Sequence, residues 1–152
     1  MESVEGKTES ARILIIDDEP VIRDLLHDVL SCRGFLVNTA EDAKSGLITA
    51  TSTPHDVIFT DIRMPGMNGL EVCRQLRHIC PESRIIMMTG YGLEEMIQEA
   101  LTLGAFASVK KPFDIQDIYD LVDRALGSIR HEKDRPSQDQ RRPEDEDNAR
   151  DD

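Results

Sequence analysis

The chain reads Arg-Ile-Leu-Ile-Ile-Asp-Asp at residues 12–18, so an aliphatic run ends directly on two aspartates. A short and nearly continuous apolar run is typical of a strand that is buried on both faces of a parallel sheet. Residues 56–60 and 84–88 have the same character, whereas residues 35–39 are more polar, as expected of an edge strand. A weaker fifth strand is predicted at residues 107–109.

Segments with helical periodicity separate these strands. The first begins at Pro20, because proline is favoured in the first turn of a helix, and Gly34 is its natural stop. The last begins after Asp114, a good N-cap, and repeats apolar residues on one face as far as Leu126. Three more helices are predicted at 42–51, 69–79 and 93–103. Five strand–helix alternations predict a doubly wound α/β fold, an open parallel sheet with helices on both faces.

A single domain accounts for most of the 152 residues, because a chain of this length forms one core but not two of ordinary size. We expect an N-terminal extension at 1–11 and a globular domain at 12–130. Residues 131–152 are charged and lack apolar periodicity, which predicts a disordered acidic tail.

Composition and charge argue against several classes of partner. The formal net charge is −12, and Lys and Arg form no stripe before the tail, so nucleic acid is not expected as a direct partner. Residues 1–12 contain no apolar stretch, which predicts neither a signal peptide nor membrane insertion. Cys32, Cys73 and Cys80 have no metal-ligand spacing and lie in or beside apolar helical patterns. We expect buried free thiols and a cytoplasmic location.

Polar residues gather at the carboxyl ends of the predicted strands. Asp17 and Asp18 follow the first strand, Asp61 the third, Thr89 the fourth and Lys111 the fifth. Ligands of open α/β sheets bind at this edge, so we expect the five side chains to converge. Taken singly, each is equally well explained as a helix cap or turn residue. Together, three carboxylates about 4 Å apart repel by about 4 kcal/mol per pair at an effective dielectric constant of about 20, which requires a compensating positive charge.

The compensation predicts a chemistry. Lys111 offsets one charge, and Mg²⁺ is expected to offset the rest, because it prefers hard carboxylate oxygens and retained water. A metal ion, an ammonium and a hydroxyl can share the three equatorial oxygens of a phosphoryl group while one carboxylate attacks in line. The predicted product is an aspartyl phosphate.

Four motifs resemble those of response-regulator receiver domains, the CheY-like superfamily of two-component and phosphorelay signalling. The resemblance covers about residues 12–129, and the combination and order of its motifs are highly specific. We therefore expect a flavodoxin-like, five-stranded sheet with strand order 2-1-3-4-5. The motifs are Ile-Leu-Ile-Ile-Asp-Asp-Glu-Pro at 13–20, Thr-Asp-Ile-Arg-Met-Pro-Gly-Met-Asn-Gly at 60–69, Met-Thr-Gly-Tyr-Gly at 88–92, and Lys-Lys-Pro-Phe at 110–113.

The resemblance assigns a role to each residue of the site. It implies that Asp61 is phosphorylated, and that Thr89 and Lys111 hold the phosphoryl oxygens, with Lys110 facing solvent. The implied Mg²⁺ ligands are Asp17, Asp18, Asp61 and the backbone carbonyl of Arg63.

Three further features follow from the same resemblance. A cis peptide bond is implied before Pro112, and the side chains of Arg63 and Tyr91 are implied to border the phosphoryl group, with plain surface exposure as the alternative. Ser108 stands where many receivers carry a Tyr or Phe that rotates inward behind the threonine, and a serine cannot fill that space. Phe106 could substitute, although a packing role is favoured.

The predicted function is a phospho-acceptor switch that takes a phosphoryl group from a phosphohistidine donor and signals through changed protein interactions. It is not expected to be a conventional enzyme, although it assists its own phosphorylation and dephosphorylation. The expected partners are a sensor histidine kinase or a histidine phosphotransfer protein, docking beside the first helix and the loop at Pro112 and Phe113, and a downstream protein target.

Alternatives remain at three levels. Within the family, a stand-alone regulator is favoured by the acidic tail, but the chain could be the receiver of a larger transcriptional activator. A phosphohydrolase resembling the haloacid dehalogenase superfamily is disfavoured, because Arg63 stands where such enzymes need a second aspartate. A binding module with a vestigial pocket would be expected to lose one of the five site residues, and none is lost.

Overall fold

The computed structural model describes residues 10–90 and 92–133. Its main sheet has five parallel strands in the order β2-β1-β3-β6-β7. Counted within this sheet the order is 2-1-3-4-5, so the predicted doubly wound fold is confirmed, with the polar second strand at one edge. The strands are β1 (Arg12–Ile16), β2 (Leu36–Ala40), β3 (Val57–Asp61), β6 (Arg84–Thr89) and β7 (Ala107–Lys110).

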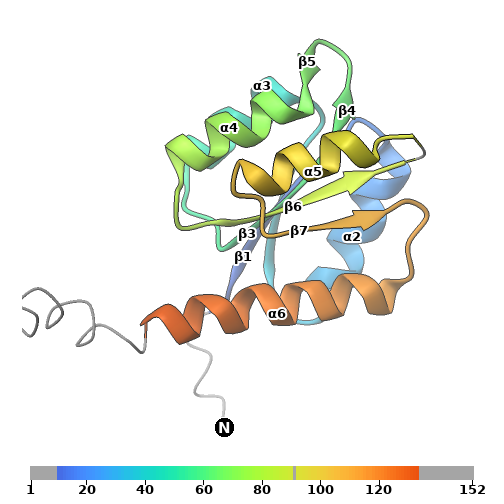
Figure 1. Ribbon diagram of the computed structural model, residues 1–152. Coiled ribbons are helices and arrows are strands. Elements are labelled where there is room, and N and C mark those ends of the chain that lie inside the picture. Colours follow the sequence, from blue (N-terminus) through green and yellow to red (C-terminus); the bar gives the residue numbers. More distant parts are fainter. Residues whose placement is uncertain (1–9, 91, 134–152) are drawn as a thin grey trace, which may run out of the picture.

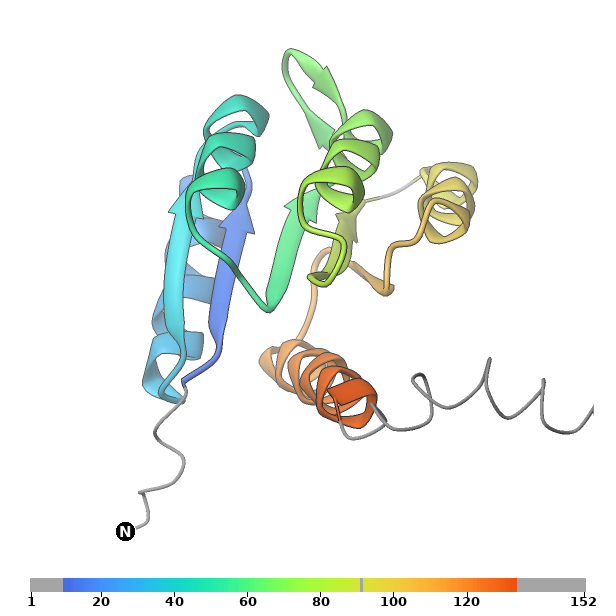
Figure 2. The same ribbon diagram turned by 90° about the vertical axis from the view of Figure 1, so that its left-hand side faces the viewer.

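Five helices cover the two faces of the sheet. Figure 1 shows α3, α4 and α5 on one side and α2 and α6 on the other, and Figure 2 shows the same layers after a quarter turn. The helices are α2 (Pro20–Cys32), α3 (Ala43–Ser52), α4 (Gly69–Ile79), α5 (Glu94–Thr102) and α6 (Ile115–Lys133). Among residues 10–90 and 92–133, none of these helices is long and apolar enough to cross a membrane.

The alternation of strand side chains divides the core into two layers. Successive side chains of a strand point to opposite faces. Ile13 and Ile15 of β1 therefore pack with α2 and α6, whereas Leu14 and Ile16 pack with α3, α4 and α5. All four side chains are fully buried. This burial on both faces explains why the strand reads as a continuous apolar run.

A small hairpin after β3 was not predicted. The sequence indicated only a turn there, but β4 (Arg63–Met64) and β5 (Met67–Asn68) pair antiparallel. Asn68 then caps α4, because its Oδ1 accepts a hydrogen bond of 2.7 Å from the backbone N–H of Leu70. The hairpin leads the chain from the end of β3 directly into α4, beside the carboxyl edge of the sheet.

Helices α3 and α5 each differ by one residue at both ends from the predicted ranges 42–51 and 93–103. Asp42 is the N-cap of α3 rather than its first residue, since its carboxylate accepts a hydrogen bond of 2.8 Å from Ser45 N–H. Helix α6 continues to Lys133, beyond Leu126, where the predicted apolar pattern ended. Arg84 stabilises this last part of α6, because its guanidinium donates to Ser128 Oγ at 2.8 Å and pairs with Glu132 at 3.0 Å.

The cysteine prediction is wrong for one residue. Cys73 is buried and Cys80 is half-buried, but Cys32, the last residue of α2, is exposed. Residues 1–9 and 134–152 lie outside the described residues, so the predictions for the N-terminal extension and the acidic tail remain predictions.

Candidate functional site

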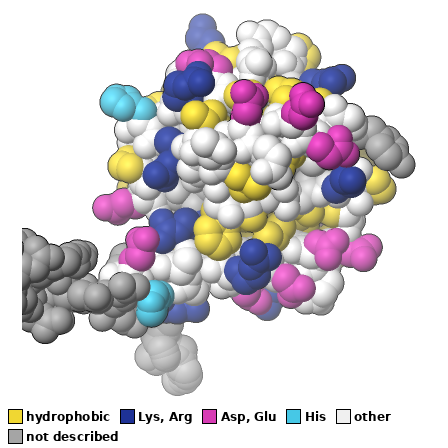
Figure 3. All heavy atoms as spheres, viewed as in Figure 1, with side chains coloured by type: hydrophobic (Ala, Val, Ile, Leu, Met, Phe, Trp, Pro, Cys, Tyr) yellow, Lys and Arg dark blue, Asp and Glu magenta, His cyan; other side chains and the backbone are white. Residues whose placement is uncertain are grey.

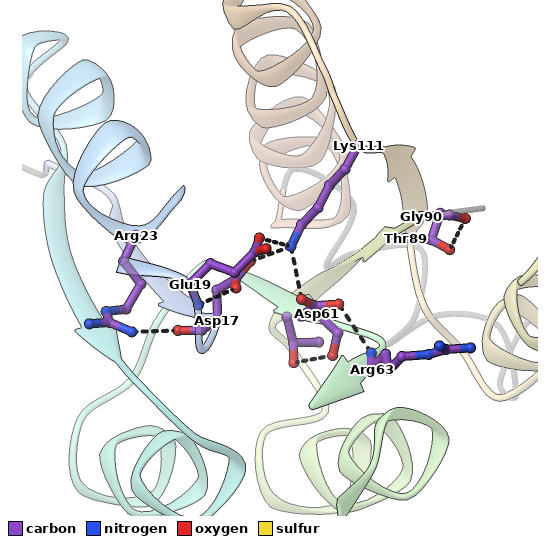
Figure 4. A network of polar contacts seen from close by, with 9 residues as sticks. Asp17, Glu19, Arg23, Asp61, Arg63, Thr89, Gly90 and Lys111 are labelled. Carbon is purple, nitrogen blue, oxygen red and sulfur yellow. Dashed lines mark hydrogen bonds and ion pairs between the residues drawn. The ribbon is translucent and has the colours of Figure 1, made fainter. Parts of the chain in front are cut away.

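The candidate site lies at the carboxyl edge of the sheet, where β1, β3 and β7 end. Asp17 directly follows β1, Asp61 is the last residue of β3, and Lys111 directly follows β7. Because these strands are parallel and share one sheet, their carboxyl ends bring the three side chains together (Figure 4). The structure therefore unites Asp17, Asp61 and Lys111 as the sequence predicted.

Lys111 is the centre of this arrangement. Its Nζ lies 2.8 Å from Asp17 Oδ2, 2.8 Å from Asp61 Oδ2 and 3.0 Å from Glu19 Oε1. The peptide bond to Pro112 is cis, as the resemblance implied. Burial alone would lower the pKa of Lys111, but its contacts with the three carboxylates outweigh this effect, so the pKa is raised and the ammonium is retained. Lys110 is exposed, in agreement with the choice of Lys111.

Asp17 is the most deeply buried carboxylate of the site, with 0% exposure. Burial raises its pKa, and the contact with Lys111 and a hydrogen bond of 2.9 Å from Glu19 N–H to Oδ1 offset part of this rise. Oδ2 forms the ion pair of 2.8 Å with Lys111, but no described donor is aligned with it as a hydrogen bond. Asp17 Oδ2 therefore has capacity for a further positively charged ligand.

The site has the composition of a hard-metal site. Asp17, Glu19 and Asp61 each offer a carboxylate oxygen, and these oxygens lie within 4.8 Å of one another. Three carboxylates against one ammonium leave an excess of two negative charges when all are ionised. A divalent cation with oxygen preference fits both the donor set and the charge.

One member of this acidic group was missed and one predicted member is absent from it. Glu19 was given no role in the sequence analysis, although it lies in the first motif and its side chain reaches Lys111. Asp18 is exposed and is not one of the three grouped carboxylates. The turn after β1 explains the difference, because Asp17 Oδ1 accepts from Glu19 N–H and brings residues 17 and 19 to the same side. The sequence signal that could have identified Glu19 was its position as an acidic residue just before Pro20 and the first helix.

Arg63 contacts Asp61 through its backbone, and Thr89 lies beside the site. The backbone N–H of Arg63 donates to Asp61 Oδ1 at 3.1 Å, while its exposed side chain extends away from Asp61 (Figure 4). Thr89 is buried beside the site, but its hydroxyl donates to Gly90 O at 3.2 Å rather than facing Asp61. Tyr91 lies outside the described residues.

Ser108 lines a cavity behind Thr89. The cavity has a volume of about 190 Å³ and lies between β6, β7 and α5. Phe106 does not enter it, because its ring packs in the opposite core layer with α6, where Arg124 lies 6.0 Å from the ring centroid. The packing role predicted for Phe106 is thus confirmed.

Sequence and structure comparisons identify proteins that are similar to this chain. A family model described as response regulator receiver domain matches residues 13–123. The chain is 38% identical over 115 residues to sporulation initiation phosphotransferase F of Bacillus subtilis (strain 168), covering 76% of this chain and 93% of that protein. It is 37% identical over 115 residues to the regulatory protein AtoC of Escherichia coli (strain K12), covering 76% of this chain.

The relatives differ greatly in length. The chain spans 25% of AtoC, in contrast to 93% of the Bacillus protein. A solved structure of a response regulator receiver domain protein from Clostridium thermocellum superposes with a TM-score of 0.74 and 32% identity, covering 78% of this chain and 95% of that chain. The matched region contains all the residues that form the candidate site.

Proposed function

The chain belongs to the family of response regulator receiver domains, and we propose that Asp61 receives a phosphoryl group from a phosphohistidine donor in a Mg²⁺-dependent reaction. The observation that carries this proposal is the position of Lys111 between Asp17 and Asp61, with contacts of 2.8 Å to each. The ammonium lies where it can also reach an oxygen of a group bound to Asp61.

The transfer step can be written for the residues present. An oxygen of Asp61 attacks phosphorus, the P–N bond of the donor breaks, and its electron pair stays on the departing imidazole, which takes up a proton. The backbone N–H of Arg63 holds Oδ1 at 3.1 Å and so fixes the orientation of the attacking carboxylate. Lys111 and Thr89 are proposed to bind the phosphoryl oxygens, for which the Thr89 hydroxyl must turn away from Gly90.

The proposed ligands of Mg²⁺ are Asp17, Asp18, Asp61 and the backbone carbonyl of Arg63. When bound, the ion supplies positive charge that offsets the charge of the phosphoryl oxygens. The oxygen cluster of Asp17, Glu19 and Asp61 supports the proposed roles of Asp17 and Asp61. We further propose that the chain assists its own phosphorylation and dephosphorylation rather than acting as a conventional enzyme.

The output is proposed to pass through the surface of α5, β7 and α6. A phosphoryl group adds about −1.5 to −2 charges to the site, and Thr89 and Lys111 must reorganise around it. Lys111 directly follows β7, a strand of this surface, and Thr89 ends the neighbouring strand β6. Figure 3 shows apolar side chains at the centre of this face, between α5 and α6, with charged side chains around them. A downstream protein that binds this face is the proposed recipient of the signal.

A second function within the family is favoured by one observation. Because the chain spans only 25% of AtoC, it can also be proposed as the receiver region of a longer regulator. In either case the donor is proposed to be a sensor histidine kinase or a histidine phosphotransfer protein. The proposed chemistry at Asp61 is the same in both cases.

Intact-mass analysis tests the proposal. The protein is incubated with acetyl phosphate and Mg²⁺, beside an Asp61→Asn variant and a metal-free sample. We expect a metal-dependent gain of one phosphoryl mass that the variant lacks. The proposal fails if no adduct forms and if beryllofluoride, a stable phosphoryl mimic, does not bind in the presence of Mg²⁺.

A further inference from the structure

The ammonium of Lys111 is enclosed by carboxylates. Its nitrogen lies 2.8, 2.8 and 3.0 Å from oxygens of Asp17, Asp61 and Glu19, and the contacts to Asp61 and Glu19 are hydrogen bonds. An incoming phosphoryl oxygen, which the proposed function requires Lys111 to bind, therefore competes with these carboxylates for the ammonium. The inference below rests on that proposed function and concerns which contact is released.

The three contacts differ in how easily water can replace Lys111. The side chains of Asp17 and Asp61 are 0% and 10% exposed, so losing the ammonium while the phosphoryl group approaches, before Asp61 is modified, leaves a carboxylate that is largely shielded from solvent. The side chain of Glu19 is 58% exposed, and water can solvate its carboxylate as soon as Lys111 leaves. The contact to Glu19 is also the longest of the three. The contact between Lys111 and Glu19 therefore has the lowest free-energy cost of breaking.

The carboxylate of Glu19 has no other evident structural task. Glu19 occupies the N-cap position of α2, where a side chain usually accepts a hydrogen bond from the first turn of the helix. The Glu19 side chain makes no such bond. Its backbone is fixed independently, because its N–H donates to Asp17 Oδ1 at 2.9 Å and its carbonyl accepts from Arg23 N–H at 3.0 Å. The side chain is thus committed to Lys111 while the turn is held by the main chain.

We propose that Glu19 is a positioning residue that holds one donor of Lys111 in the resting state and releases it to an oxygen of the incoming phosphoryl group. No covalent bond changes in this step. The ammonium exchanges a carboxylate acceptor for a phosphoryl acceptor, and Glu19 exchanges the ammonium for water. Glu19 therefore opposes binding of a phosphoryl group at Asp61 and favours the resting state.

The consequence is that removing the charge of Glu19 tightens phosphoryl binding. The test compares beryllofluoride affinity of the unmodified chain with that of Glu19→Gln, at a Mg²⁺ concentration that saturates each variant. Glu41→Gln is the matched control, since it removes one exposed carboxylate that also follows a strand but does not contact Lys111. We expect Glu19→Gln to bind about two- to fivefold more tightly, the range that an exposed ion pair provides, and Glu41→Gln to bind like the unmodified chain.

The other outcomes are distinct. Unchanged or weaker binding by Glu19→Gln, with an unaltered melting temperature, overturns the proposal. An equal gain in both variants also overturns it, because the effect would then be general charge repulsion. A damaged fold cannot imitate the expected result, since damage weakens binding. If the unmodified chain binds no beryllofluoride, the proposed function itself fails, and this inference fails with it.

Discussion

Gly69→Ala is predicted to destabilise the fold by about 2–3 kcal/mol, the upper part of the range for overpacked sites. A Cβ atom at Gly69 would lie 2.1 Å from the carbonyl oxygen of Ile62 and 2.5 Å from its Cα, which are backbone atoms that cannot rotate away. The backbone must therefore shift by about 1 Å or more to restore an ordinary van der Waals separation of about 3.5 Å. Ile62 directly follows Asp61, so the shift also displaces the carboxylate that is proposed to be phosphorylated.

Gly127→Ala provides the matched control. Gly127 lies within α6, and a Cβ there has no neighbouring atom within 4 Å. Alanine should stabilise the helix by about 0.5–1 kcal/mol through its higher helix propensity. The free energies of unfolding are obtained from urea titrations of both variants. The reasoning is refuted if Gly69→Ala is as stable as the unmodified chain, or if the two variants differ by less than about 1 kcal/mol.

Two further predictions concern the charges of the site. Mg²⁺ at a hundredfold excess over its dissociation constant should raise the free energy of unfolding by about 2.7 kcal/mol. Asp61→Asn should lose most of this gain at the same Mg²⁺ concentration, as measured by thermal unfolding. An equal gain in the variant would contradict the assignment of Asp61 as a ligand. Without metal, Asp17→Asn should be more stable than the unmodified chain at pH 7 by about 1 kcal/mol, because burial raises the pKa of Asp17 and makes its ionised form unfavourable in the fold. This difference in the free energy of unfolding should shrink as the pH falls through the raised pKa of Asp17 towards the ordinary value near 4, because the carboxyl is then protonated in both the folded and the unfolded state. Urea titrations at decreasing pH measure it. A difference that grows toward pH 4.5 would contradict the raised pKa.

The strands and most helices could be predicted because each carries a local signal. The continuous apolar run at 12–16 reflects burial on both faces of β1, and Pro20 begins α2 as expected. The hairpin of β4 and β5 could not be predicted, because strands of two residues are too short to show a period of two. The part of α6 beyond Leu126 has no apolar periodicity of its own, and Arg84 stabilises it from a distant part of the chain.

The part of the site that depends only on the order of the parallel strands could be predicted from the sequence. Asp17, Asp61 and Lys111 converge because each lies at the carboxyl end of a strand of one sheet. The position of Glu19 depends on one turn and one side-chain conformation, neither of which leaves a pattern in the sequence. The hydroxyl direction of Thr89 is likewise a rotamer choice, which explains why its contact with Gly90 was not expected.

Competition for the ammonium of Lys111 connects the resting site with the proposed switch. The ammonium of Lys111 already contacts three carboxylates, so an incoming phosphoryl oxygen competes with them for it. Phosphorylation of Asp61 must then change the position of Lys111, which directly follows β7 and whose backbone N–H donates to Thr89 O at 2.6 Å. The movement of one side chain is thus coupled to the ends of β6 and β7, which border the surface proposed to bind the downstream partner.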